Sequence, residues 1–184
     1  NEIVPFITKP GAGIILLHGE PGTGKTTFLR YLISKYEENF VYIPNTLMNN
    51  ITDPTFIQFA MNMYGAIFII EDGEKIFAKR MDTHGNEATN DFLNLADGIL
   101  GDLMSFKIIG TFNCKIGDID EAFLRPGRCK SIYEFKKLNE DKAKKLAEKL
   151  GVDKEIKGKA TLADIYNNDL LQSEKKNKLG FGDN

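Results

Sequence analysis

The sequence predicts an α/β fold of three layers, in which a five-stranded, mostly parallel sheet lies between helices. Short apolar runs rich in β-branched and aromatic residues alternate along the chain with segments of helical periodicity. Strands that alternate with helices pair in parallel, and their helices cover both faces of the sheet. The run Ala66–Ile70 is apolar throughout, as expected of a central strand that is buried on both sides.

Five runs are expected to form the strands, and five segments the helices. The expected strands are Gly13–His18, Phe40–Pro44, Ala66–Asp72, Phe106–Asn113 and Ser131–Phe135. The expected helices are Thr26–Glu38, Asp53–Tyr64, Asn86–Met104, Asn139–Leu150 and Thr161–Asn167. Phe92, Leu95, Ala96, Ile99 and Leu103 recur at helical spacing and predict one apolar face for the third helix.

The ends of the last two helices carry recognisable capping residues. Asn139 is a plausible N-cap that precedes two acidic residues, and Gly151 is expected to end that helix. Thr161 and Asp164 have the spacing of a capping box.

Composition narrows the possible classes of protein. The chain has 184 residues, of which 42% are hydrophobic and 27% charged, which is ordinary for a soluble globular protein. A net charge of -2 gives no overall attraction to nucleic acid or to an anionic membrane, so neither is favoured as a partner. No apolar run approaches the roughly 18 residues that a membrane helix requires. With only two cysteines, Cys114 and Cys129, we expect a reducing, cytoplasmic setting without a disulfide framework.

The strongest motif is the segment GEPGTGKT at Gly19–Thr26, which fits the phosphate-binding loop pattern G-x-x-x-x-G-K-[ST]. It follows an apolar strand and opens a helix, so backbone N–H groups and the helix N-terminus can converge on phosphate oxygens. Lys25 can reach the β and γ phosphates, and the Thr26 hydroxyl can ligate Mg²⁺. The residues expected to bind ATP are Gly19, Glu20, Pro21, Gly22, Thr23, Gly24, Lys25, Thr26 and Thr27.

A second candidate feature is the acidic end of the strand AIFIIEDGE, at Ala66–Glu74. Acids at this place can hold Mg²⁺ and orient the attacking water. We assign Glu71 to the metal and Asp72 to activation of the water, because four apolar residues then precede the pair. In the alternative register Asp72 holds the metal and Glu74 is a more distant base. In the first register the shorter Asp72 must reach the water, so hydrolysis could be slow.

A third polar strand end is found at Lys107–Asn113 (KIIGTFN). If this strand lies between the other two, Asn113 is expected near the γ-phosphate, where it can position the water.

The segment Ile109–Arg128, IGTFNCKIGDIDEAFLRPGR, closely resembles the second region of homology of AAA ATPases. With the loop and the acidic strand, the resemblance covers about residues 10–140 and implies a P-loop NTPase core. It implies that Asn113 is the first sensor and that Arg125 and Arg128 are arginine fingers. A guanidinium that contacts the γ-phosphate bound by a neighbouring copy stabilises the charge that develops during phosphoryl transfer. The resemblance therefore implies a ring of copies, expected to be a hexamer. The Glu-Asp order resembles the branch that contains the mitochondrial Rieske-protein translocase.

Two parts of the sequence depart from the family pattern. The region after Leu138 is shorter than the usual helical lid and offers no clear second-sensor arginine. The segment Leu47–Ile51 (LMNNI), where the family often carries a substrate-gripping aromatic, offers only aliphatic apolar side chains, so it could grip a polypeptide or pack beneath a neighbour. We expect a nucleotide-binding domain over residues 1–138, a reduced lid over 139–171 and a flexible tail over 172–184.

These observations predict a Mg²⁺-dependent ATPase that remodels a protein or protein–nucleic-acid partner. Two alternatives stay open. One is a nucleotide-gated switch or scaffold with little hydrolysis, and the other is a replication ATPase such as a helicase or clamp loader.

Overall fold

The computed structural model describes residues 2–51, 53–78, 93, 95–96, 98–152 and 155–167. The chain divides into two compact units. The first comprises Asn1–Gly19 and Lys25–Glu134, and the second comprises Glu20–Gly24 and Phe135–Asn184.

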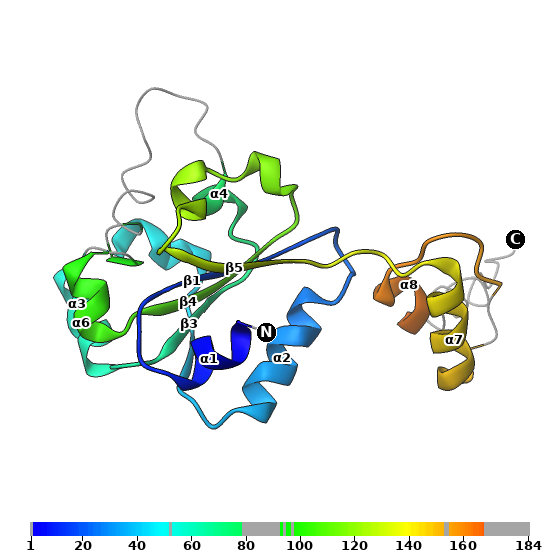
Figure 1. Ribbon diagram of the computed structural model, residues 1–184, viewed down its shortest axis with the longest axis horizontal. Coiled ribbons are helices and arrows are strands. Elements are labelled where there is room, and N and C mark those ends of the chain that lie inside the picture. Colours follow the sequence, from blue (N-terminus) through cyan, green and yellow to red (C-terminus); the bar gives the residue numbers. More distant parts are fainter. Residues whose placement is uncertain are drawn as a thin grey trace, which may run out of the picture. The chain divides into compact units, whose positions relative to one another are not determined.

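A five-stranded parallel sheet forms the centre of the first unit (Figure 1). Its strands are β1 (Gly13–His18), β2 (Phe40–Tyr42), β3 (Ile67–Ile70), β4 (Lys107–Phe112) and β5 (Cys129–Glu134). They lie in the order β2-β3-β4-β1-β5, which is typical of a P-loop NTPase core. The predicted α/β fold is therefore confirmed. Because β4 lies between β1 and β3, the segments that leave these three strands emerge at the same edge of the sheet.

Helices follow the strands in the expected alternation. The first unit contains α1 (Ile3–Thr8), α2 (Lys25–Lys35), α3 (Pro54–Asn62), α4 (Glu74–Phe77) and α6 (Ile99–Met104). It also contains the 3-10 helices η1 (Asn45–Asn50), η2 (Ile116–Asp118) and η3 (Glu121–Leu124). The second unit contains α7 (Glu140–Leu150) and α8 (Leu162–Tyr166). No helix in the described part of the chain is long and apolar enough to cross a bilayer.

An aromatic cluster fills one face of the sheet. The Phe77 ring lies 5.0 Å from the Phe123 ring, edge to face, and 6.2 Å from the Phe112 ring. All three side chains are fully buried, in a core that also contains Phe68 and Ile108 from the strands. This packing anchors α4 directly beside the end of β4.

The opposite face is covered by α1 and α2, which Figure 1 shows together on that side of the sheet. Both helices bury apolar side chains, Ile3 and Ile7 from α1 and Leu29 and Leu32 from α2. The buried Lys107 amine donates to the Ile7 carbonyl oxygen at 3.0 Å and so ties α1 to the start of β4. Burial lowers the pKa of Lys107, and the Glu38 carboxylate partly offsets that effect.

The long helix expected over Asn86–Met104 differs in its described part. Residues 86–92 lie outside the described residues, and Leu95 and Ala96 are buried as expected. A separate helix, α6, begins after Gly98, whose backbone is extended. The interruption changes the helical phase, so Ile99 and Leu103 are 83% and 69% exposed, and the prediction that they share the buried face was wrong.

The second unit has its own small core, formed by Ala143, Ala147, Ile156, Ala160 and Ile165. The predicted caps are confirmed. The Asn139 side chain accepts from the Lys142 N–H, Gly151 ends α7 in the left-handed conformation, and Thr161 and Asp164 form a capping box. The tail over 172–184 lies outside the described residues.

Candidate nucleotide site

Thr26 and Glu71 meet at the edge of the sheet where β1, β3 and β4 end. Thr26 is the last residue of the phosphate-loop motif and lies in the first turn of α2, and Glu71 is the first residue after β3. The Thr26 hydroxyl donates to Glu71 Oε1 at 2.7 Å. Mg²⁺ prefers oxygen ligands such as a hydroxyl and a carboxylate. It needs only one or two of them from the protein, because water and substrate phosphates supply the rest. This pair therefore fits the metal position expected for Glu71.

Asp72 and Asn113 form a second pair at the same edge. The Asn113 side chain donates through Nδ2 to Asp72 Oδ1 at 3.0 Å. Asp72 has a φ of 50°, which is uncommon for a residue other than glycine, and its N–H donates to Thr111 Oγ1 at 3.1 Å. The end of β4 thus holds both the backbone and the side chain of Asp72.

Glu74 also reaches the end of β4. Its Oε1 accepts a hydrogen bond from the Asn113 backbone N–H at 2.7 Å. The Thr26–Glu71 contact is compatible with the register in which Glu71 is the metal-side acid, and that assignment stays a prediction. The Glu74 carboxylate lies beside Asn113, and Glu74 is one helical turn before Phe77 in α4.

Asn45 is a site residue that the sequence reasoning did not single out. It begins η1, and its Nδ2 donates to the carbonyl oxygens of Glu71 and Asp72 at 3.0 and 3.1 Å. Thr111 was missed for the same reason. Both contact backbone groups of the acidic segment, and an isolated polar residue near the end of a strand carries no recognisable pattern. A usable signal would have been that a polar residue follows shortly after β2, as polar residues directly follow β3 and β4.

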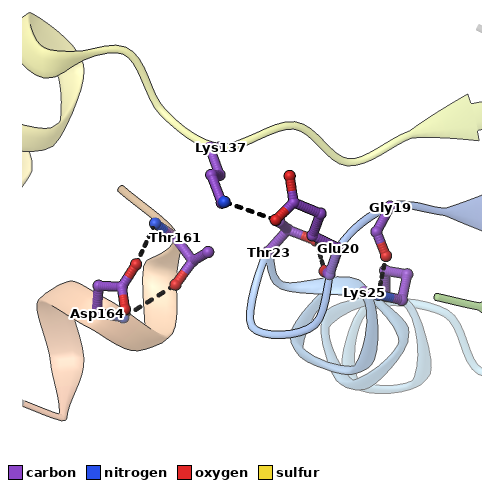
Figure 2. Close-up of polar contacts among 7 residues, drawn as sticks. All are labelled: Gly19, Glu20, Thr23, Lys25, Lys137, Thr161 and Asp164. Atoms are coloured by element: carbon purple, nitrogen blue, oxygen red, sulfur yellow. Dashed lines mark hydrogen bonds and ion pairs between the residues drawn. The ribbon is translucent and has the colours of Figure 1, made fainter. Parts of the chain in front are cut away.

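Lys25 begins α2 and is almost fully buried. Its amine donates to the Gly19 carbonyl oxygen at 2.7 Å, as Figure 2 shows. Burial lowers the pKa of Lys25, whereas the nearby carboxylates of Asp72 and Glu74 act to raise it. The Lys25 amine therefore lies at the end of the sheet that carries the acids.

The tip of the phosphate loop, Glu20–Gly24, belongs to the second unit. The Ala163 N–H, at the start of α8, donates to the Gly22 carbonyl oxygen at 3.0 Å. Gly22 and Gly24 have φ values of 79° and 103°, and a Cβ on Gly24 would lie 2.6 Å from Leu162 Cδ1. Glycine is required at both positions, because another residue would meet both backbone strain and a steric clash.

A charged contact joins the same loop tip to the strand-to-helix connection of the second unit. Lys137 Nζ lies 2.6 Å from Glu20 Oε2, and Thr23 Oγ1 donates to the Glu20 carbonyl oxygen at 2.7 Å (Figure 2). The ion pair raises the pKa of Lys137. Glu20 was expected only as a residue of the phosphate loop, and the structure adds its ion pair with Lys137.

The structure distinguishes the two arginines expected to act as fingers. Arg125 is exposed after η3, where its position leaves the guanidinium accessible to another molecule. Arg128 is buried, and its guanidinium donates to the Ala122 carbonyl oxygen. Arg128 therefore fixes the turn that presents Arg125.

The segment Leu47–Ile51 forms most of η1 and the residue after it. Leu47 is exposed and lines a groove of about 450 Å³ together with Tyr42 and Phe59. An apolar groove beside this segment is compatible with either expectation for it, a polypeptide or a neighbouring copy.

Comparison with known proteins gives one family. Residues 15–137, which include most of β1 and all of β2 to β5, match the model of the "ATPase family associated with various cellular activities (AAA)". The match covers more than half of the chain.

Two of the similar proteins have names that refer to the proteasome. The chain is 31% identical to the proteasome-activating nucleotidase of Aeropyrum pernix over 132 residues, which is 65% of this chain and 32% of the relative. It is 30% identical to a 26S proteasome regulatory subunit 4 homolog of Oryza sativa subsp. japonica over 147 residues, or 69% and 31%. The chain thus spans about a third of the length of these relatives. These relatives do not support the Rieske-protein translocase branch that the Glu-Asp order suggested, so the order of the two acids was a poor guide to the branch.

Proposed function

The chain belongs to the AAA family of ATPases, and from this we propose that it binds ATP with Mg²⁺ at Gly19–Thr27 and hydrolyses it. The observation that carries the proposal is the meeting of two pairs at one edge of the sheet. Thr26 contacts Glu71, and Asn113 contacts Asp72. The first pair offers oxygen ligands for Mg²⁺. The second offers a carboxylate that can accept a proton from water, and an amide that orients this carboxylate.

Each residue has a separate task in this proposal. The loop backbone and Lys25 bind the phosphates, because converging N–H groups and a buried cation are complementary to a polyanion. Mg²⁺, when bound, neutralises charge on the β and γ phosphates, and Thr26 and Glu71 would hold it. Asp72 accepts the proton of the attacking water, while Asn113 fixes the direction of the Asp72 carboxylate.

We assign completion of the site to a second copy of the chain. The exposed Arg125 supplies a guanidinium to a neighbour's γ-phosphate, where it stabilises the charge that develops during transfer. Arg128 positions the turn from within the same chain, through its contact with Ala122. Such a head-to-tail contact closes into a ring, which we expect to be a hexamer.

The work driven by hydrolysis is assigned to a polypeptide partner. The named relatives are a proteasome-activating nucleotidase and a proteasome regulatory subunit homolog, and the groove beside Leu47 is lined mainly by apolar and aromatic side chains. We therefore place remodelling of a protein ahead of action on nucleic acid.

Two variants test the site directly. Lys25→Ala should abolish binding of a fluorescent ATP analogue, because it removes the buried cation that faces the phosphates. Asp72→Asn should bind the analogue with little change and release phosphate at least about a hundredfold more slowly, the size expected for loss of a general base. Glu37→Ala, at an exposed position after α2, is the matched control and should behave as wild type. Wild-type turnover by Asp72→Asn would contradict the assignment.

A nucleotide-gated switch with little hydrolysis is the second candidate. The observation that favours it is the engagement of the short Asp72 carboxylate by Asn113, which leaves less of it for water. Binding of ATP by the wild-type protein, with phosphate release no faster than the background rate without protein, would establish the switch and exclude the enzyme.

A further inference from the structure

Four hydrogen bonds join the segments that leave β3 and β4. Three of them have been described: Asp72 N–H to Thr111 Oγ1, Asn113 Nδ2 to Asp72 Oδ1, and Asn113 N–H to Glu74 Oε1. In the fourth, the Gly73 N–H donates to the Thr111 carbonyl oxygen at 2.9 Å. The pairing of the two strands therefore continues beyond the sheet into the candidate catalytic residues.

Among these four hydrogen bonds, only the one to Glu74 is made by the backbone N–H of Asn113. The bond is short, at 2.7 Å, and a carboxylate acceptor makes it stronger than a bond between neutral groups. The amide of the same residue points to Asp72. A shift of the Asn113 backbone would therefore be transmitted to the direction of the Asp72 carboxylate.

The packing of α4 explains why Glu74 lies at this position. Phe77, three residues later in the same short helix, is fully buried among aromatic rings. A Cβ on Gly73 would lie 2.5 Å from the Phe77 ring, and one on Gly110 would lie 2.6 Å from it. Because Gly110 lies in β4, the close fit of the Phe77 ring against it seats α4 on that strand, with Glu74 at the strand's end.

We propose that Glu74 is a positioning residue for ATP hydrolysis, which acts by holding Asn113 so that its amide orients Asp72. The assignment rests on the proposed function. It gives Glu74 a task different from that of a distant base, because the role needs only a hydrogen-bond acceptor and no exchange of protons.

This difference makes the two roles separable by substitution. Glutamine keeps an acceptor oxygen at the same reach but cannot take a proton at neutral pH, whereas alanine removes the acceptor. Glu74→Ala should lower kcat about tenfold or more, because small misplacements of catalytic groups are costly, and should leave the KM for ATP nearly unchanged. Glu74→Gln should retain kcat to within about threefold, since it preserves the neutral counterpart of the same hydrogen bond.

The experiment measures steady-state phosphate release by the full chain with Mg²⁺ and ATP, for wild type, Glu74→Ala, Glu74→Gln and the control Glu37→Ala. A second readout is the NMR signal of the Asn113 backbone amide proton. It should move upfield in Glu74→Ala, in which its hydrogen bond is lost, and should stay near its wild-type position in Glu74→Gln.

The outcomes are distinct. Equal loss of kcat in both Glu74 variants would overturn the positioning role in favour of a base. A Glu74→Ala variant with wild-type kcat, or with an unmoved Asn113 amide signal, would overturn it outright. A wild-type protein that binds ATP but releases no phosphate would instead contradict the proposed function, and the positioning role with it, while the NMR signal would still report whether Glu74 holds Asn113.

Discussion

At the scale of single residues, the acidic segment is controlled through its backbone as much as through its side chains. Asp72 has a left-handed conformation that costs energy for a residue with a side chain. Asn45 compensates by donating to the carbonyl oxygens of Glu71 and Asp72, which belong to the two peptide groups that flank the Asp72 Cα. The conformation of Asp72 is thus maintained by an amide from another strand end.

We therefore predict a functional loss in Asn45→Ala. The variant removes both donors, so Asp72 should sample other conformations, and kcat should fall about fivefold, which corresponds to about 1 kcal/mol for a hydrogen bond. Asn39→Ala, at an exposed position directly before β2, is the control and should have wild-type activity. Steady-state phosphate release measures both. Equal rates for Asn45→Ala and the control would show that the contact has no role in turnover.

At the scale of elements, the short helix α4 links the core to the site. Phe77 packs against Phe112 and Phe123, and one turn earlier Glu74 contacts the end of β4. Core packing and site geometry are therefore not independent in this part of the chain.

Phe77→Ala should destabilise the protein by about 3–5 kcal/mol, because it removes a fully buried ring and leaves a cavity. Phe59→Ala is the matched control. Phe59 is 40% exposed on α3, and its loss should cost about 1 kcal/mol or less. Urea denaturation followed by circular dichroism compares the two. A smaller loss of stability in Phe77→Ala than in Phe59→Ala would contradict this description of the core.

The same elements show what the sequence could predict. The strands and the phosphate loop were predictable, because apolar periodicity and a glycine-rich motif are local signals. The helix α4 was missed because four residues are too few to show periodicity. The exposure of Ile99 and Leu103 was missed because the break after Gly98 shifts the helical phase. Contacts such as Asn45 with Asp72 depend on strand order, which no local pattern reports.

At the scale of the whole molecule, the two arginines of the motif RPGR divide their tasks. Both were expected to act as fingers, but of the two only Arg125 is exposed, whereas Arg128 is buried against Ala122. An exposed guanidinium on a fixed turn is suited to act on a neighbouring copy. The proposed enzyme is therefore complete only when copies of the chain associate.

Mixing two inactive variants tests this central claim most directly. Arg125→Ala and Asp72→Asn should each release phosphate slowly, since every interface in either ring lacks one partner. In a mixture, some interfaces combine an intact Asp72 from one copy with an intact Arg125 from its neighbour, so phosphate release should rise well above the sum of the two separate rates. A mixture that releases phosphate no faster than that sum, at concentrations at which the wild-type protein is active, would contradict the shared site.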